Sequence, residues 1–115
     1  MVINKEQFQE NFKFFDKEII VEIIDLFIDE FDERMKTLKE NIDASDRESL
    51  VFHAHSIKGV ISNFVAEEPR EFAKQLEEKA KLSDQTELLE IYHKLYGSTA
   101  QLVDELKAIR VIYES

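Results

Sequence analysis

Residues 17–41 of the chain read KEIIVEIIDLFIDEFDERMKTLKEN, and this stretch decides the fold. Its apolar residues recur at the three- and four-residue spacing that places side chains on one face of an α-helix. Acidic residues fill the other face in the first half and lysines come late, as the helix dipole favours. The pattern predicts one long amphipathic helix, with an apolar face made of Ile20, Ile23, Ile24, Phe27, Ile28, Phe31, Met35, Leu38 and Ile42.

Two capping sequences predict further helices before and after this one. Asn4 with Gln7, and Ser45 with Glu48, have the three-residue spacing of a capping box. We therefore expect a short helix over residues 5–14 and a longer one that begins after Ser45 and continues to about residue 64. The short helix places three phenylalanines on one face, namely Phe8, Phe12 and Phe15.

Two more helices are expected in the second half of the chain. One begins near Pro69, which is tolerated in the first turn of a helix, and ends near residue 81. The last covers about residues 85–113 and contains Gly97, which weakens it by about 1 kcal/mol relative to alanine and which we assign to packing or a mild bend. Four long amphipathic helices with short connections predict an all-α fold, an antiparallel four-helix bundle with the short N-terminal helix over one end.

Composition narrows the class of protein. The chain has 115 residues, 43% of them hydrophobic, which indicates a single domain over residues 1–115. It has no cysteine, which excludes disulfides, Cys-ligated zinc and iron–sulfur clusters. A formal net charge of −10 disfavours nucleic acid and anionic membranes as partners. With no apolar run long enough to span a membrane and no signal peptide, we expect a cytoplasmic protein and, by default, a monomer.

The helix expected over residues 45–64 carries two different stripes. Its apolar stripe faces the core and consists of Leu50, Ala54, Ile57, Ile61 and Phe64. A second stripe, rotated away from the core, consists of His55, Lys58, Gly59 and Ser62. The residues that pack against the core and the residues with a second role therefore lie on different faces of the same helix.

The second stripe has the residue types that phosphoryl transfer to histidine needs. A neutral imidazole is a nucleophile near neutral pH, and Lys58, one turn after His55, offers a positive charge to a transferring phosphoryl group. Gly59 has no side chain and leaves room for a partner, and Ser62 is small enough to keep the face open. A lone exposed histidine is usually only a solvated residue, so the interpretation rests on these residues together.

The other two histidines fit a metal site poorly. His53 lies about 160° from His55 on the helical wheel, so we expect a satisfied, partly buried side chain. His93 belongs to Glu90-Ile-Tyr-His93, a single E-x-x-H sequence, whereas di-iron bundles need two such motifs and two further glutamates. We therefore expect the protein to have no metal and no cofactor of its own.

Residues 54–66, AHSIKGVISNFVA, resemble the signature of histidine-containing phosphotransfer (HPt) domains, roughly A-H-x-L-K-G-x-x-x-x-[LF]-G-A. Residues 54–59 also resemble the phosphotransfer domain of chemotaxis histidine kinases. Leu76-Glu77 matches a further family feature, and the helix order fits the whole chain. The chain departs from the signature at Val65, where the family has a glycine that helps it leave the helix.

The resemblance implies a fold and a role for each residue. His55 is then the phosphorylated residue through Nε2, with Lys58 and Gly59 in the family's charge and clearance roles. Glu77 falls where relatives carry a residue that hydrogen-bonds Nδ1 of the imidazole and fixes its tautomer. The implied protein is a phosphorelay carrier rather than an enzyme. Its implied partners are response-regulator receiver domains, which supply Mg²⁺, and a sensor or hybrid histidine kinase.

A docking surface is expected around the second stripe, which we call the reactive stripe. Val51 and Phe52 lie near His55, and the short first helix adds Phe12 or Phe15, while Ser62 extends the stripe. An equally weighted alternative has Val51 and Phe52 packing against the first helix. The rival function is a helical interaction module that binds a receiver or another signalling partner without transferring phosphate.

Overall fold

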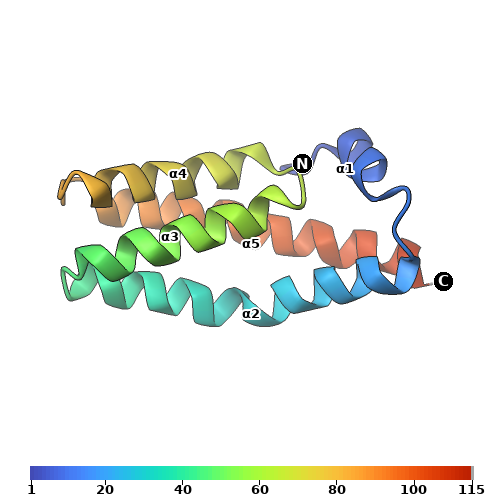
Figure 1. The fold of residues 1–115 in the computed structure, drawn as a ribbon, viewed down its shortest axis with the longest axis horizontal. Helices are drawn as coiled ribbons and strands as arrows, with labels where there is room; N and C mark the ends of the chain where they lie inside the picture. The colour runs from blue at the N-terminus through green and yellow to red at the C-terminus, as the bar shows by residue number, and fades with distance from the viewer. Residues whose placement is uncertain (115) are drawn as a thin grey trace.

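The computed structural model describes residues 1–114, and its helices form the expected antiparallel bundle (Figure 1). The long helices run alternately in opposite directions along a body of 45 × 22 × 20 Å, and α1 covers one end. α3 packs between α2 and α4, and α5 packs against α2 and α4. The bounds of the five helices are α1 Lys5–Phe12, α2 Lys17–Asp43, α3 Arg47–Ser62, α4 Glu67–Lys81 and α5 Leu88–Glu114.

The core is formed by the apolar stripes predicted from the sequence. On α2, Ile20, Ile24, Phe27, Met35 and Leu38 are buried, while the remaining four members of the stripe are half-buried beside them. The predicted apolar stripe of α3 is buried as well, including Phe64 just beyond the helix. Burial of these side chains, at about 1.5–3 kcal/mol each, is what holds the four helices together.

Three residues at the N-terminus fasten the first segment to the bundle. Ile3 forms an isolated antiparallel bridge with Ala66, and the backbone N–H of Asn4 donates to the Val65 carbonyl at 2.9 Å. Val2 and Ile3 both donate backbone N–H groups to the carboxylate of Glu105 on α5, at 2.8 and 3.0 Å. α1 is therefore held at the Ser62 end of α3.

The predicted N-cap of α3 is wrong by one residue. Asp46, and not Ser45, caps the helix, because its side chain accepts the backbone N–H of Ser49 at 3.2 Å. Ser45 has a φ of 52° and makes the turn out of α2. At α1 the predicted cap is present on one side, since Asn4 accepts the N–H of Gln7, but Gln7 bonds Asn11 instead of returning the contact.

Helix ends differ from the predictions elsewhere for local reasons. α4 begins at Glu67, so that Pro69 lies within its first turn without opening it. α5 begins at Leu88, because Asp84 accepts both the N–H and the hydroxyl of Thr86 and holds a turn there. Gly97 does not serve close helix packing, since a Cβ there would meet nothing within 4 Å.

Val65 takes a left-handed conformation with a φ of 54°, at the position where the HPt signature has glycine. A left-handed backbone costs a non-glycine residue about 1–2 kcal/mol, and a β-branched residue is among the least suited to it. The N-terminal bridge and the Asn4–Val65 hydrogen bond hold the loop in this shape. The chain thus makes a left-handed turn here with an unfavourable residue.

We predict that Val65→Gly raises the free energy of unfolding by about 1 kcal/mol, because it removes this strain. Urea unfolding followed by circular dichroism measures the change. Val60→Gly is the matched control, since Val60 is also half-buried but lies within α3, and it should lower stability. A loss of stability in Val65→Gly equal to that of the control would contradict the prediction.

Candidate functional site

The site centres on His55, whose side chain is 67% exposed on α3. Its Nδ1 lies 2.9 Å from Oε2 of Glu77 on α4, the contact that the resemblance predicted. A deprotonated carboxylate can only accept, so Nδ1 carries the proton and donates it to Glu77. In the neutral imidazole this leaves the lone pair on Nε2, the nitrogen at the exposed end of the ring.

Glu77 is a buried carboxylate with three cationic or donor partners. It is 3% exposed, and besides His55 it contacts Lys58 Nζ at 2.7 Å through Oε1 and Lys81 Nζ at 3.1 Å through Oε2. Burial alone would raise the pKa of Glu77, but the hydrogen bonds from Lys58, Lys81 and His55 outweigh it and lower the pKa from 4.5 to about 2. The carboxylate therefore stays charged and remains an acceptor at neutral pH.

The other members of the reactive stripe surround this pair. Lys58 is 23% exposed and is held by Glu77, so its charge is fixed close to the histidine's own acceptor. A Cβ on Gly59 would meet nothing within 4 Å, so no internal contact requires glycine there. The Ser62 hydroxyl donates to the Lys58 carbonyl at 2.8 Å and accepts from Nε of Arg70 at 3.2 Å.

The residues predicted for docking separate into two groups. Val51 and Phe52 line a shallow groove together with His55 and Glu77, and Phe52 is 68% exposed. Phe12 and Phe15 line a second groove with Ser62, at the end of α3 that α1 covers. The alternative in which Val51 and Phe52 pack against α1 is wrong, because α1 lies at the other end of α3.

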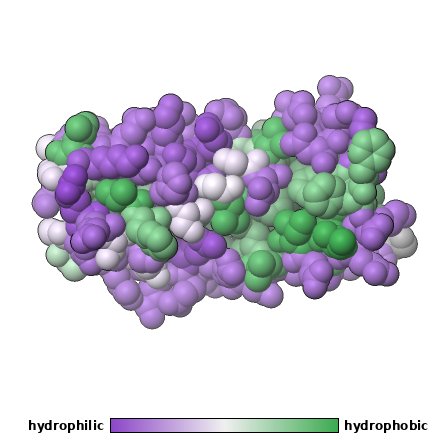
Figure 2. All heavy atoms as spheres, viewed as in Figure 1, coloured by the Kyte–Doolittle hydropathy of each residue, from purple (hydrophilic) through white to green (hydrophobic). Residues whose placement is uncertain are grey.

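A hydrophobic area is visible at the α1 end of the bundle, while most of the rest of this face is hydrophilic (Figure 2). Phe14 and Phe15 in the α1–α2 connection and Ile19 in the first turn of α2 are exposed, Phe14 by 89%. Clusters of exposed apolar side chains on a folded domain mark interaction sites. The second groove, lined by Phe12, Phe15 and Ser62, borders this area.

Neither of the other histidines takes part in the site. His53 is half-buried, and its Nδ1 lies 3.0 Å from Oδ1 of Asn41, as expected of a satisfied side chain. His93 is exposed on α5. Within residues 1–114 no group of three or more His, Asp or Glu side chains is arranged to hold a metal ion. Over the same residues, no helix has both the length and the apolar character needed to cross a membrane.

Sequence reasoning missed Lys81 as a partner of Glu77. The signal was present, because the two residues are four apart on one helix, the spacing at which a glutamate and a lysine meet. Many such pairs occur on exposed helix faces, and only the burial of Glu77 singles this one out.

A family model for the Hpt domain matches residues 22–111. The match covers most of the chain, so the protein belongs to the Hpt domain family. Hpt domains are helical bundles that carry phosphoryl groups on histidine in phosphorelays and interact there with receiver domains and kinases. Comparisons with curated proteins and with solved structures found no match.

The low pKa of Glu77 has a consequence for stability. A carboxyl group with a folded-state pKa of about 2 and an ordinary value of 4.5 stabilises the fold fully above pH 4.5, and this stabilisation is lost as pH falls toward 2. We predict that Glu77→Gln lowers the free energy of unfolding by about 2 kcal/mol at pH 7, and that the difference closes near pH 2.

Denaturant unfolding of both proteins at several pH values measures this difference. Glu90→Gln is the control, because Glu90 forms the same i, i+4 pair with a lysine but is 63% exposed. A constant gap between the wild type and Glu77→Gln from pH 7 to pH 2 would show that Glu77 contributes packing rather than charge.

Proposed function

We propose that this chain is a phosphorelay carrier in which His55 accepts a phosphoryl group from a receiver-domain aspartate or from a kinase and passes it to another receiver. In the transfer, Nε2 of His55 attacks the phosphorus atom and forms the N–P bond. The P–O bond to the donor's aspartate breaks, and the carboxylate leaves. The reverse steps deliver the phosphoryl group to the next aspartate.

The observation that carries the proposal is the orientation of the imidazole. Glu77 holds Nδ1 from inside the bundle at 2.9 Å, while the ring is two-thirds exposed. The proton on Nδ1 stays hydrogen-bonded as positive charge develops on the ring, and the nearby carboxylate stabilises that charge. Attack through Nε2 therefore requires no proton transfer within the carrier.

The surroundings of Nε2 support access by a large partner. Gly59 presents no side chain one turn from His55 and has open space around it. Lys58 places a positive charge in this region, which favours an incoming phosphoryl group. As the family resemblance implies, we assign the Mg²⁺ that such transfers use to the receiver.

Docking of the receiver is assigned to the two apolar grooves. Phe52 and Val51 border His55 on one side, and the groove of Phe12, Phe15 and Ser62 lies further along α3. A receiver seated over Gly59 would contact both grooves. Exposed aromatic side chains are the residue type that contributes most to such interfaces.

The first experiment tests the acceptor. Purified protein is mixed with a panel of radiolabelled phospho-receivers, and we predict an acid-labile, base-stable label that His55→Gln abolishes and His53→Gln leaves in place. His53 is the matched control, because it lies on the same helix but is satisfied by Asn41. Undiminished label in His55→Gln would refute the assignment. Receiver binding without any transfer would favour the non-transferring interaction module.

The second experiment tests the docking surface with the receiver that labels the chain. We predict that Phe52→Ala and Phe15→Ala each weaken binding about fivefold or more, measured by isothermal titration calorimetry. Val111→Ala is the control, since Val111 is 60% exposed on α5, which packs on α2 and α4 away from the reactive stripe. Equal effects of all three variants would contradict the assignment.

A further inference from the structure

His55 and Lys81 share one oxygen atom of Glu77. Nδ1 of His55 lies 2.9 Å and Nζ of Lys81 3.1 Å from Oε2, while Lys58 occupies Oε1. The atom that accepts the imidazole proton is therefore also the atom that a second lysine contacts. Any change in the charge of Lys81 acts directly on the acceptor of His55.

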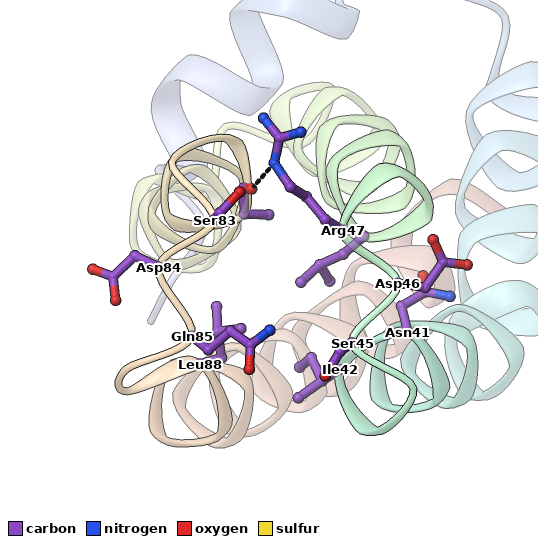
Figure 3. A pocket seen from close by; sticks show the side chains of 11 residues that line it. Asn41, Ile42, Ser45, Asp46, Arg47, Ser83, Asp84, Gln85 and Leu88 are labelled. Atoms are coloured by element: carbon purple, nitrogen blue, oxygen red, sulfur yellow. Dashed lines mark hydrogen bonds between the residues drawn. The ribbon is translucent and has the colours of Figure 1, made fainter.

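The position of Lys81 is fixed by a contact from α3. It is the last residue of α4, where helix carbonyls lack partners within the helix and the end tends to fray. Arg47 closes this end, since its Nε donates to the Ala80 carbonyl at 2.9 Å and its terminal nitrogen to the Lys81 carbonyl at 2.5 Å. Figure 3 shows Arg47 reaching across the mouth of a pocket between the α2–α3 and α4–α5 connections.

The pair of Lys81 with Glu77 differs from the other lysine–glutamate pairs at the same spacing. In Lys94 with Glu90 both side chains are more than half exposed and the closest atoms are 3.5 Å apart. Exposed pairs of that kind contribute little. Glu77 is 3% exposed, so the charge of Lys81 acts on a carboxylate that water screens poorly.

Six charged side chains lie around His55, and their formal charges sum to zero. On α4 Glu77 contributes one negative charge and Lys81 one positive, and on α3 Lys58 adds a second positive. Glu48 lines the same groove from α3. From α2, Arg34 donates to the Ser56 hydroxyl beside His55 and is paired with Glu30.

This arrangement resolves a conflict in the chemistry of the site. A buried carboxylate next to a histidine favours the doubly protonated imidazolium, which has no lone pair to attack phosphorus. Lys58 and Lys81 offset the charge of Glu77 while leaving its oxygen in place to hold the proton on Nδ1. The ring is then oriented by a carboxylate without being driven into its unreactive form.

We propose that Lys81 is a positioning residue for phosphoryl transfer, which offsets the charge of Glu77 so that His55 stays a neutral imidazole with Nε2 free. The inference rests on the proposed function of His55. Lys81 acts through Glu77 and does not contact the reacting nitrogen. Removal of the Lys81 charge should therefore slow transfer only at pH values where part of the His55 population is imidazolium, that is, on the acidic side of neutral pH.

The test uses phosphoramidate, a small phosphoryl donor that needs no receiver. Nε2 of neutral His55 forms the bond to phosphorus, the donor's P–N bond breaks, and ammonia leaves. The initial rate of labelling is followed by ³¹P NMR from pH 5.5 to pH 9, with the rate of His55→Gln subtracted as background. Lys81→Gln, Lys81→Arg and Lys94→Gln are compared with the wild type.

We expect Lys81→Gln to label about threefold more slowly than the wild type at pH 6 and at the same rate at pH 9, so that its profile moves to higher pH. Lys81→Arg keeps the charge and should restore the wild-type profile, and Lys94→Gln should not change it. Circular dichroism confirms that each variant is folded.

The outcomes separate the two proposals. Labelling that His55→Gln does not reduce overturns the proposed function. Labelling at His55 with superimposable profiles for the wild type and Lys81→Gln overturns the role of Lys81 alone. A uniform loss of rate at every pH in Lys81→Gln also overturns it, because a purely structural contact would act in that way.

Discussion

The buried carboxylate of Glu77 is the interaction on which the site depends. An unpaired charge at 3% exposure would be strongly unfavourable, and this one is stable because three donors from two helices surround it. His55 and Lys58 come from α3 and Lys81 from α4, so the same contacts that satisfy the carboxylate also fix α3 against α4. The orientation of the His55 ring is thus part of the packing of the bundle and does not rely on a flexible loop.

On α3 the residues that pack in the core and the residues of the site lie on different faces of the helix. Leu50, Ala54, Ile57 and Ile61 are buried on one side, and His55 and Gly59 are exposed on another. Because a helix is rigid over this length, the apolar stripe sets the direction in which His55 points. Substitutions in the core of α3 would therefore disturb the site through the angle of the helix, even without touching any of its residues.

Much of the fold and part of the site followed from the sequence, because both depend on helical periodicity. The long helices, the core of α2 and the common face of His55, Lys58 and Gly59 were predicted by spacing, and the contact with Glu77 by resemblance to the family. The turns were not predictable in this way. Ser45, Val65, Ser83 and Glu87 all adopt left-handed conformations, whereas both glycines lie within helices. Residue preference points the other way at each of these positions. Local backbone hydrogen bonds at the ends of α2 and α4 make the turns at Ser45 and Ser83, and a long-range bond from Asn4 holds Val65.

The contacts at the far end of α4 were also beyond sequence reasoning. Arg47 donates hydrogen bonds to two backbone carbonyls on a helix more than thirty positions away, and no local pattern encodes a bond to a carbonyl.

The family match has a limit of its own. It begins at residue 22, so it does not include Phe12 and Phe15. His55 and Glu77 therefore lie in the part of the chain that the family model matches, while the apolar area around α1 lies largely outside it. The contact between His55 and Glu77 joins α3 to α4 alone, so changes at exposed side chains of α1 would leave it in place, whereas Phe8 and Phe12 of α1 are buried in the core.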